Sequence, residues 1–565
     1  MTGRKEYERW LACPALTTEE RAELEGLSDE DVTSRFFAPL AFGTAGLRGV
    51  MGAGINRMNS RIVAQTTRAL AEQVRGTGGA ERGIVICFDC RENSRTFAET
   101  AARVAAAAGV RVMLFEDMRP TPELSFAIRS LGAAAGLNIT ASHNTREYNG
   151  YKVYWGDGAQ LPPAEAAVIA ARMEKIDVLS DIPQLPLREA AEAGLLTVFG
   201  AETDEAFISA VLAQSRDREA IRAAADMKIV YTPFHGTGYR LVPEVLRRAG
   251  VRGLVCVDGQ MKPDGTFPTV KSPNPEEAEG FTLALQCAEG CGAELIMGTD
   301  PDADRFACMA LHGGEYRLIT GNQLGALLLD YVIGARRRAG DMPEKPAAIK
   351  SIVSTGLAAA IARAEGVRME ETFTGFKFLA ERMGELEADG WETVMCFEEA
   401  IGYLIGGFAR DKDGVTASLV TAEMASYYYN RGMTLVDALD ALYEKFGRYA
   451  ERTVSLVMPG LDGLADMKAL MAGLRTTPPT ALAGLPVESV TDYLTGTKNG
   501  ESAGECSLKG SDVLRFDLLC GDTVIVRPSG TEPKIKIYLL SHGEDCSARL
   551  EALTAWAKGL KAPEA

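Results

Sequence analysis

The chain has 565 residues, of which 46% are hydrophobic and 24% charged, and its net charge is -17. At about 150 residues per domain, this length predicts roughly three to five domains in an ordinary globular protein. The negative charge argues against nucleic acid and anionic membranes as partners, since both require a basic surface.

The apolar segments of the chain are short. No run reaches the roughly 18 apolar residues of a membrane span, and the first residues alternate between charged and apolar types, unlike a signal peptide. Eleven cysteines, mostly set inside apolar segments, favour reduced thiols. We therefore expect a cytoplasmic protein.

Residues 1–41 are expected to form a helical arm, in which Thr17 can cap a charged helix. From Gly83 onward, strand and helix patterns alternate, which indicates a parallel sheet with crossover helices. The expected strands are Ile84–Phe88, Val110–Phe115 and Ala134–Thr140, and the expected helices are Arg95–Ala108 and Pro122–Ser130.

The same order of elements returns twice. Gly109, Gly250 and Gly366 each end an Ala- and Arg-rich helix, and Val-Arg opens a strand after each of them. The last part of the chain is rich in strand signals and closes with a helix. We predict three related mixed α/β domains with largely parallel sheets, over residues 42–200, 201–312 and 313–448, and an α+β domain over residues 449–565.

The polar segment Thr140–Asn144 follows the apolar run Ala134–Ile139. In an open α/β sheet, ligands gather at the carboxyl ends of strands, so the Ser142 hydroxyl is expected to face a crevice. The adjacent His143 could orient or deprotonate this hydroxyl. An isolated Ser-His pair is more often an ordinary polar turn, so the interpretation depends on other loops of the chain.

A second loop, Gly298–Arg305, places Asp300, Asp302 and Asp304 at alternate positions after an apolar strand. Three carboxylates so close require a cation, and hard oxygen ligands favour Mg²⁺. An EF-hand is excluded, because Arg305 and Leu311 stand where that loop needs Gly and Glu. A solvated acidic turn is the alternative without a metal.

A third loop, Arg527–Lys534, lies between two strand-like segments. Arg527, the hydroxyls of Ser529 and Thr531, and the backbone freedom of Gly530 together indicate a phosphate-binding loop. Taken alone, the same residues could form a polar hairpin turn.

Five segments together resemble the signatures of the α-D-phosphohexomutase superfamily, in the same order along the chain. The similarity extends over roughly residues 42–540 and is greatest to phosphoglucomutases, including the branch that acts on pentose phosphates. The matching segments are Phe42–Gly49, Thr140–Asn144 with Tyr148–Lys152, Gly298–Arg305, Phe397–Gly402 and Arg527–Pro533.

The resemblance implies a four-domain, heart-shaped isomerase. It would interconvert hexose 1-phosphate and hexose 6-phosphate, most readily those of glucose, through a phosphoserine and a sugar 1,6-bisphosphate that also acts as activator. Phosphomannomutase and phosphopentomutase activities are the alternatives. A small phosphosugar would be the substrate, no nucleic acid or membrane would bind, and the protein would be a monomer or a homodimer.

Residue roles follow from the same motif match. Ser142 would carry the phosphoryl group and, with Asp300, Asp302 and Asp304, bind Mg²⁺. The residues implied near the reacting centre are Arg48, His143, Lys152, Arg305 and Lys377. Those implied in substrate binding are Glu398 for the sugar hydroxyls and Arg527, Ser529, Gly530 and Thr531 for the phosphate that does not react. This division suits phosphoryl transfer, which depends on positioning and charge neutralisation.

Two positions depart from the family pattern. Thr145 replaces the usual proline after Ser-His-Asn, which restores a backbone N–H and frees φ. Ala400 replaces the usual serine two residues after Glu398, which removes a hydroxyl expected to contact the sugar.

Other protein classes fit the residues less well. A serine hydrolase would need glycines around Ser142 and has no use for the acidic loop. A non-catalytic sugar-phosphate sensor would not need both the nucleophile and the metal ligands. A simple phosphatase would be distinguished by release of free phosphate during turnover.

Overall fold

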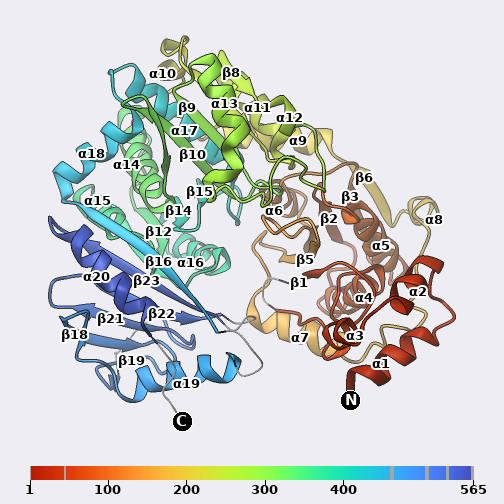
Figure 1. Cartoon of the computed structure of the whole chain (residues 1–565). Coiled ribbons are helices and arrows are strands. Elements are labelled where there is room, and N and C mark those ends of the chain that lie inside the picture. The colour runs from red at the N-terminus through yellow and green to blue at the C-terminus, as the bar shows by residue number, and fades with distance from the viewer. Residues whose placement is uncertain (1, 44–45, 459–462, 503–507, 530–533, 561–565) are drawn as a thin grey trace.

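The structure is a computed structural model of the whole chain, and it describes all residues except 1, 44–45, 459–462, 503–507, 530–533 and 561–565. Four sheets with their helices form what we call the first to fourth blocks (residues 2–199, 201–319, 321–446 and 449–558), which are arranged around the centre of the molecule (Figure 1). No helix in the described part of the chain combines the length and apolar character needed to cross a membrane.

The first block contains a helical arm and a six-stranded sheet of order β1-β5-β4-β2-β3-β6. Strands β4, β2, β3 and β6 run parallel to one another. Strand β5 pairs antiparallel with β4, and β1 pairs antiparallel with β5. The elements are α1 (Thr2–Leu11), α2 (Thr18–Glu25), α3 (Asp29–Phe36), β1 (Leu47–Val50), α4 (Ser60–Gly76), β2 (Ile84–Phe88), α5 (Ser94–Ala107), β3 (Val112–Phe115), α6 (Thr121–Ser130), β4 (Ala135–Ile139), β5 (Tyr148–Trp155), α7 (Pro163–Met173), α8 (Leu187–Glu192) and β6 (Leu196–Phe199).

The expected elements of this block are present. Thr17 caps α2 in a capping box with Glu20, and the alternation of β2, α5, β3, α6 and β4 follows the predicted order. The strands β2, β3 and β4 are buried throughout, as parallel strands covered on both faces must be.

The second block has a five-stranded sheet of order β11-β10-β9-β7-β8, in which β9, β7 and β8 are parallel. The predicted boundary between residues 312 and 313 falls inside the β10–β11 hairpin, because β11 pairs with β10 in this sheet. The elements are α9 (Ala201–Leu212), α10 (Arg218–Ala223), β7 (Lys228–Thr232), α11 (Gly238–Ala249), β8 (Gly253–Cys256), α12 (Asp258–Met261), the 3-10 helix η1 (Ala278–Phe281), α13 (Thr282–Cys291), β9 (Leu295–Thr299), β10 (Phe306–His312) and β11 (Glu315–Ile319).

The third block has a four-stranded sheet of order β13-β12-β14-β15, with β13, β12 and β14 parallel. Its helices share one continuous apolar core with the second block. The elements are α14 (Gly321–Ala339), β12 (Pro346–Ser351), α15 (Gly356–Ala364), β13 (Arg368–Thr372), α16 (Phe376–Ala388), β14 (Glu392–Glu398), β15 (Gly402–Ile405), α17 (Gly414–Tyr429) and α18 (Leu435–Phe446).

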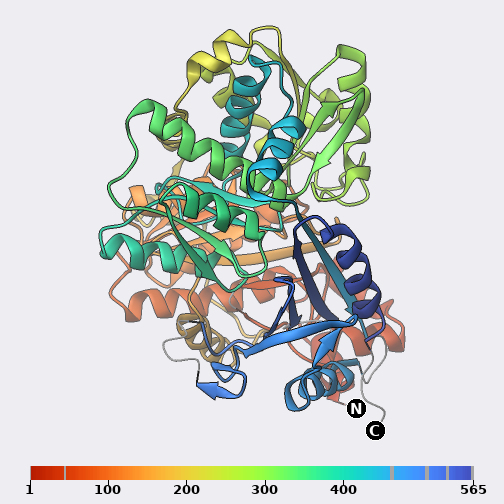
Figure 2. The same ribbon diagram turned by 90° about the vertical axis from the view of Figure 1, so that its left-hand side faces the viewer.

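The fourth block is an antiparallel sheet with its own apolar core, and α20 lies across one face of it (Figure 2). Its elements are β16 (Tyr449–Val457), α19 (Gly463–Thr476), β17 (Ala481–Leu482), β18 (Leu485–Asp492), β19 (Thr497–Lys498), β20 (Glu501–Ser502), β21 (Leu514–Leu518), β22 (Thr523–Pro528), β23 (Lys534–His542) and α20 (Cys546–Lys558). The predicted fold class, three mixed α/β domains with largely parallel sheets and a C-terminal α+β domain, is confirmed. The cysteines of the described residues are all free thiols.

Candidate active site

The Ser142 loop joins the carboxyl end of β4 to β5. Ser142 has a left-handed backbone with φ of 51°, which costs a non-glycine residue roughly 1 kcal/mol and marks a constrained position. Its N–H donates to Thr140 Oγ1 at 2.9 Å, and its hydroxyl donates to Asp300 Oδ2 at 2.6 Å. His143 Nδ1 lies 3.2 Å from the same hydroxyl oxygen. The first block therefore presents a buried serine to the second block.

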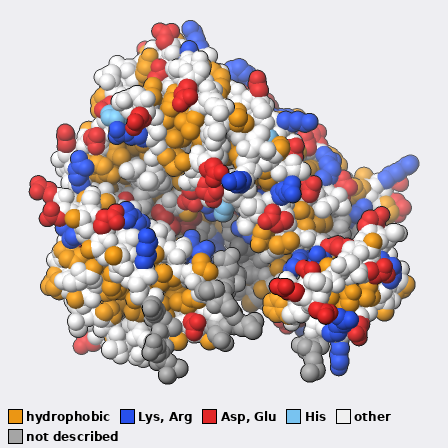
Figure 3. Space-filling model, viewed as in Figure 1, with side chains coloured by type: hydrophobic (Ala, Val, Ile, Leu, Met, Phe, Trp, Pro, Cys, Tyr) orange, Lys and Arg blue, Asp and Glu red, His pale blue; other side chains and the backbone are white. Residues whose placement is uncertain are grey.

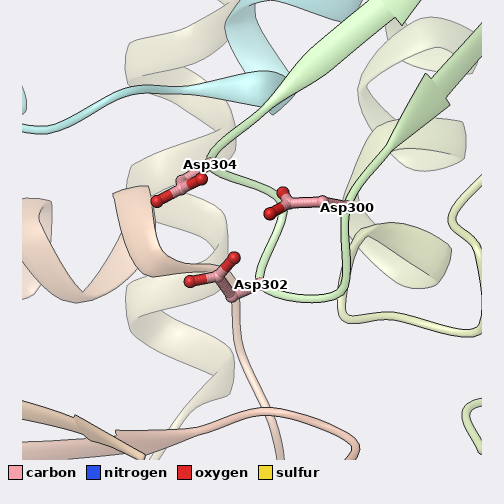
Figure 4. Close-up of side chains that lie close together, drawn as sticks. All are labelled: Asp300, Asp302 and Asp304. Carbon is pink, nitrogen blue, oxygen red and sulfur yellow. The ribbon is translucent and has the colours of Figure 1, made fainter. Parts of the chain in front are cut away.

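The acidic loop connects β9 to β10 and also needs one left-handed residue, Ala303, with φ of 52°. One carboxylate oxygen from each of Asp300, Asp302 and Asp304 lies within 4.8 Å of the others. The three groups lie around a common space (Figure 4). Asp302 Oδ1 and Asp304 Oδ1 are buried and have no hydrogen-bond partner among the described residues. Buried carboxylate oxygens without partners are costly, so this site is suited to a cation.

Two lysines from other blocks partly neutralise these carboxylates. Lys152 Nζ lies 2.6 Å from Asp302 Oδ2 and 3.3 Å from Asp304 Oδ2. Lys412 Nζ lies 3.2 Å from Asp304 Oδ2. Burial alone would raise the pKa of Asp302, but the Lys152 ammonium lowers it below the usual range. Three blocks therefore meet at one cluster of opposite charges.

The pKa values of Asp300 and His143 are shifted in opposite directions. Burial and the charges of Asp302 and Asp304 raise the pKa of Asp300 well above its usual value. Burial, with the nearby Arg305 and Arg48 guanidinium groups, holds the pKa of His143 well below its usual value. These effects favour the neutral imidazole beside Ser142.

Arg48 and Arg305 add two further cationic side chains near this site. Arg48, on β1, donates to Asn144 Oδ1 at 2.9 Å. The backbone N–H of Arg305 donates to Asp300 Oδ1 at 2.9 Å, and its guanidinium lies 3.6 Å from Glu276. The turn before Arg48 needs Gly46, which has φ of 77° and where a Cβ would lie 1.8 Å from the Tyr151 carbonyl oxygen.

Two of the predicted binding residues, Glu398 and Arg527, lie at a different place, and Lys377, which was predicted near the reacting centre, lies there with them and not beside Ser142. Lys377 and Arg527 both line a cavity of about 270 Å³ between the third and fourth blocks. Burial lowers the pKa of Lys377, and the neighbouring Arg527 charge adds to this effect, while the Glu381 carboxylate opposes it. Glu398, at the end of β14, accepts a hydrogen bond of 2.5 Å from the N–H of Gly375, which lines the same cavity.

The phosphate-binding loop is described only in part. Ser529 N–H donates to the Lys534 carbonyl oxygen at 2.7 Å, which closes the base of the loop. Gly530 and Thr531 lie outside the described residues.

A larger cavity of about 460 Å³ lies beside the Ser142 loop. His143, Arg305 and Ala400 line it together with Lys536 and Tyr538 from the fourth block. In the space-filling view the face is hollowed at its centre, where acidic, basic and histidine side chains meet (Figure 3). A ligand in this hollow could reach both the Ser142 loop and the basic side chains of the fourth block.

Sequence reasoning missed Lys412 and Thr121. Thr121 Oγ1 donates to Asp302 Oδ2 at 2.8 Å. The Lys412 side chain packs against Gly402, where a Cβ would lie 2.2 Å from it, so position 402 needs glycine. The charged run Arg410–Asp413 between two apolar elements was a signal for Lys412. Thr121 carries no such signal, because a threonine at a helix start is ordinary.

Four family models match the chain in succession. They describe the α/β/α domains I, II and III and the C-terminal domain of phosphoglucomutase/phosphomannomutase, and they match residues 39–179, 205–313, 320–446 and 476–554. The chain is 35% identical over 521 residues to a phosphoglucomutase of Staphylococcus aureus strain N315, covering 91% of this chain and 92% of the relative. A phosphoglucomutase of the bovine strain RF122 / ET3-1 is 36% identical over 510 residues, covering 89% and 90%.

Solved structures share the fold. A phosphoglucomutase/phosphomannomutase family protein from Burkholderia thailandensis aligns with a TM-score of 0.66 and 18% identity, covering 93% of this chain and 99% of that one. Parafusin, a phosphoglucomutase from Paramecium in its open form, aligns with a TM-score of 0.65 and 17% identity, covering 92% and 93%.

Fold, site and relatives together define an isomerase of the intramolecular phosphotransferase type. The chain belongs to the phosphoglucomutase/phosphomannomutase family, and the predicted resemblance to the α-D-phosphohexomutases is confirmed.

Proposed function

We propose that this enzyme interconverts hexose 1-phosphate and hexose 6-phosphate in the cytoplasm, with the glucose phosphates as its main substrates. The observation that carries the proposal is the 2.6 Å contact of Ser142 Oγ with Asp300 Oδ2, inside a buried carboxylate cluster beside a basic hollow. The names of the Staphylococcus relatives support glucose as the sugar. Mannose and pentose phosphates are the alternative substrates.

The carboxylate cluster fits Mg²⁺, which Asp300, Asp302, Asp304 and the Ser142 phosphoryl group would hold. The fit rests on the two buried carboxylate oxygens of Asp302 and Asp304 that have no partner among the described residues. When bound, the ion would neutralise negative charge on the phosphoryl group.

The protein's own residues would share the work of transfer. A sugar hydroxyl oxygen would form the new bond to phosphorus as the bond between phosphorus and Ser142 Oγ breaks. His143, whose Nδ1 lies 3.2 Å from Ser142 Oγ, would take the hydroxyl proton and pass it to the departing Oγ. Lys152, Arg48 and Arg305 stabilise the charge of the transferring group. Glu398 holds sugar hydroxyls, while Lys377 and Arg527 bind the phosphate that does not react. The sugar 1,6-bisphosphate then turns over and returns its other phosphoryl group to Ser142.

Peptide mapping by mass spectrometry tests the phosphoserine. Incubation with glucose 1,6-bisphosphate should place one phosphate on Ser142, and Ser142→Ala should abolish both the phosphate and the mutase activity. Full turnover by Ser142→Ala would exclude the covalent relay. A coupled assay with glucose 1-phosphate, mannose 1-phosphate and ribose 1-phosphate decides the sugar.

Chelation tests the cation. Removal of divalent ions should abolish activity, and added Mg²⁺ should restore it. Asp302→Asn should lose both activity and response to Mg²⁺, whereas normal behaviour of this variant would contradict the metal assignment.

A further inference from the structure

The carbonyl oxygens of the Ser142 loop converge on one buried side chain, Arg91, whose exposed fraction is 3%. Its Nη2 donates to the Ser142 carbonyl oxygen at 2.5 Å and to that of Asn144. Its Nη1 donates to the carbonyl oxygens of Thr145 at 2.8 Å and Tyr148 at 3.1 Å. One guanidinium therefore contacts four carbonyl groups along the loop that carries the reactive serine.

The guanidinium is itself fixed from two sides. Asp89, at the end of β2, lies 3.3 Å from Arg91 Nε and accepts the Arg91 N–H at 2.9 Å and the Ser94 hydroxyl at 2.7 Å. The Phe267 ring of the second block covers the guanidinium at 5.0 Å. A neighbouring residue of the same segment, Gly265, approaches so closely that a Cβ would lie 2.5 Å from the Glu92 nitrogen. A charged group enclosed in this way has little freedom to move.

We propose that Arg91 is a positioning residue for phosphoryl transfer. Its hydrogen bonds to the carbonyl oxygens of the Ser142 loop hold that loop in the reactive conformation. The proposal rests on the role of Ser142 proposed above.

The left-handed φ of 51° at Ser142 makes the loop unfavourable on its own, so an external group must stabilise it. Thr145 adds to this need, because it lacks the fixed φ of the proline found in the family pattern. A guanidinium suits the task, since its planar fork carries five N–H donors in fixed directions. A lysine ammonium keeps the charge but has three donors on a flexible stem, and it cannot reproduce the four contacts.

Arg91→Lys tests the proposal, with Arg336→Lys as the control. Arg336 is also buried, with an exposed fraction of 6%, but it pairs with Glu392 in the third block. A misplaced nucleophile lowers the rate of transfer without removing substrate contacts, so Arg91→Lys should lower kcat by about 100-fold and change KM by less than about threefold. Loading of Ser142 from glucose 1,6-bisphosphate in a single turnover should slow by a similar factor. Arg336→Lys should leave both rates within about twofold of the wild type.

The outcomes separate this proposal from the proposed function. If the wild type carries its phosphate on Ser142 and Arg91→Lys loads it at the normal rate, the positioning role is wrong and the phosphoserine stands. If the phosphate maps to another residue, the phosphoserine assignment fails first.

If Arg91→Lys is insoluble, Phe267→Leu is the variant that tests the proposal. This variant removes the ring that holds the guanidinium in place, so its hydrogen bonds to the loop should loosen and single-turnover loading should slow by several-fold at unchanged KM. An unchanged loading rate would then overturn the proposal.

Discussion

Thr121 Oγ1 donates a hydrogen bond of 2.8 Å to Asp302 Oδ2, and Thr121 N–H donates to the Asp302 carbonyl oxygen at the same distance. The start of α6 in the first block therefore fixes the carboxylate of a predicted metal ligand in the second block. Lys152 binds the same Oδ2, and among the described residues Oδ1 is the oxygen that has no hydrogen-bond partner.

Thr121→Val should weaken Mg²⁺ binding by about 10- to 100-fold, because the shape of the side chain is kept while the hydrogen bond that orients Asp302 is lost. The measurement is the Mg²⁺ concentration needed for half-maximal activity, together with direct titration of the ion by calorimetry. Thr100→Val is a matched control, since Thr100 is equally buried but donates to a carbonyl oxygen within its own helix. Equal Mg²⁺ affinity in Thr121→Val and wild type would contradict this role.

Arg527→Ala should lower kcat/KM strongly, by about 100-fold, because it removes a cation from the cavity that we assign to the phosphate that does not react. Arg527→Lys should recover part of this loss through its charge alone. Lys498→Ala, which removes an exposed cation from the same block, serves as the control. Steady-state kinetics with glucose 1-phosphate measures the effect, and a kcat/KM equal to that of the control would place the phosphate elsewhere.

Glu451 lies where β16 enters the fourth block, and one of its carboxylate oxygens is buried without a hydrogen-bond partner among the described residues. Burial raises the pKa of Glu451 from 4.5 to about 7. A carboxyl group with a raised pKa in the folded state stabilises the fold below the unfolded pKa, and this contribution is lost as pH rises through about 7.

Glu451→Gln should therefore raise the free energy of unfolding above that of the wild type at pH 8, by on the order of 1 to 3 kcal/mol, and much less at pH 5. Urea denaturation at the two pH values measures the difference. Glu551→Gln is the control, because Glu551 is exposed and pairs with Arg452. A gain of the same size at both pH values would show that ionisation of Glu451 is not its cause.

The sequence predicted the local parts of this site and missed the parts that depend on distant contacts. Ser142 and Asp300 were each identified from the apolar strand before them and the polar residues around them. Their 2.6 Å contact joins two blocks, and no local pattern predicts it. Thr121 and Lys412 were not predicted as site residues for the same reason, since each contacts its partner only when the blocks assemble.

One predicted domain boundary, between residues 312 and 313, falls within the β10–β11 strand pair. Gly313 and Gly314, directly after this boundary, form the two-residue turn of the hairpin. Their φ values of 61° and 86° suit a turn in which both central residues are left-handed, and this turn matches the twist of the strands. A Gly-Gly pair between two apolar runs is a hairpin signal as much as a linker signal.

Ala400 decides how tightly the sugar is held in our proposal. It lines the 460 Å³ cavity beside Ile401, where the family pattern places a serine hydroxyl. An intermediate that binds in two opposite orientations is best held by groups that occupy similar places in both, such as the hydroxyls of carbons 3 and 4. Carbon 2 lies outside this shared set, so both glucose and mannose phosphates should react.

Ala400→Ser should lower KM for the hexose phosphates by several-fold, as expected for one added hydrogen bond of about 1 kcal/mol. A pentose phosphate presents a different set of hydroxyls, so its KM should change less. The control is Ala359→Ser on α15, and the measurement is kcat/KM for glucose 1-phosphate, mannose 1-phosphate and ribose 1-phosphate in all three proteins. If the wild type prefers ribose 1-phosphate by orders of magnitude, the hexose assignment fails, and the absence of a hydroxyl at position 400 becomes a feature of a pentose-specific site.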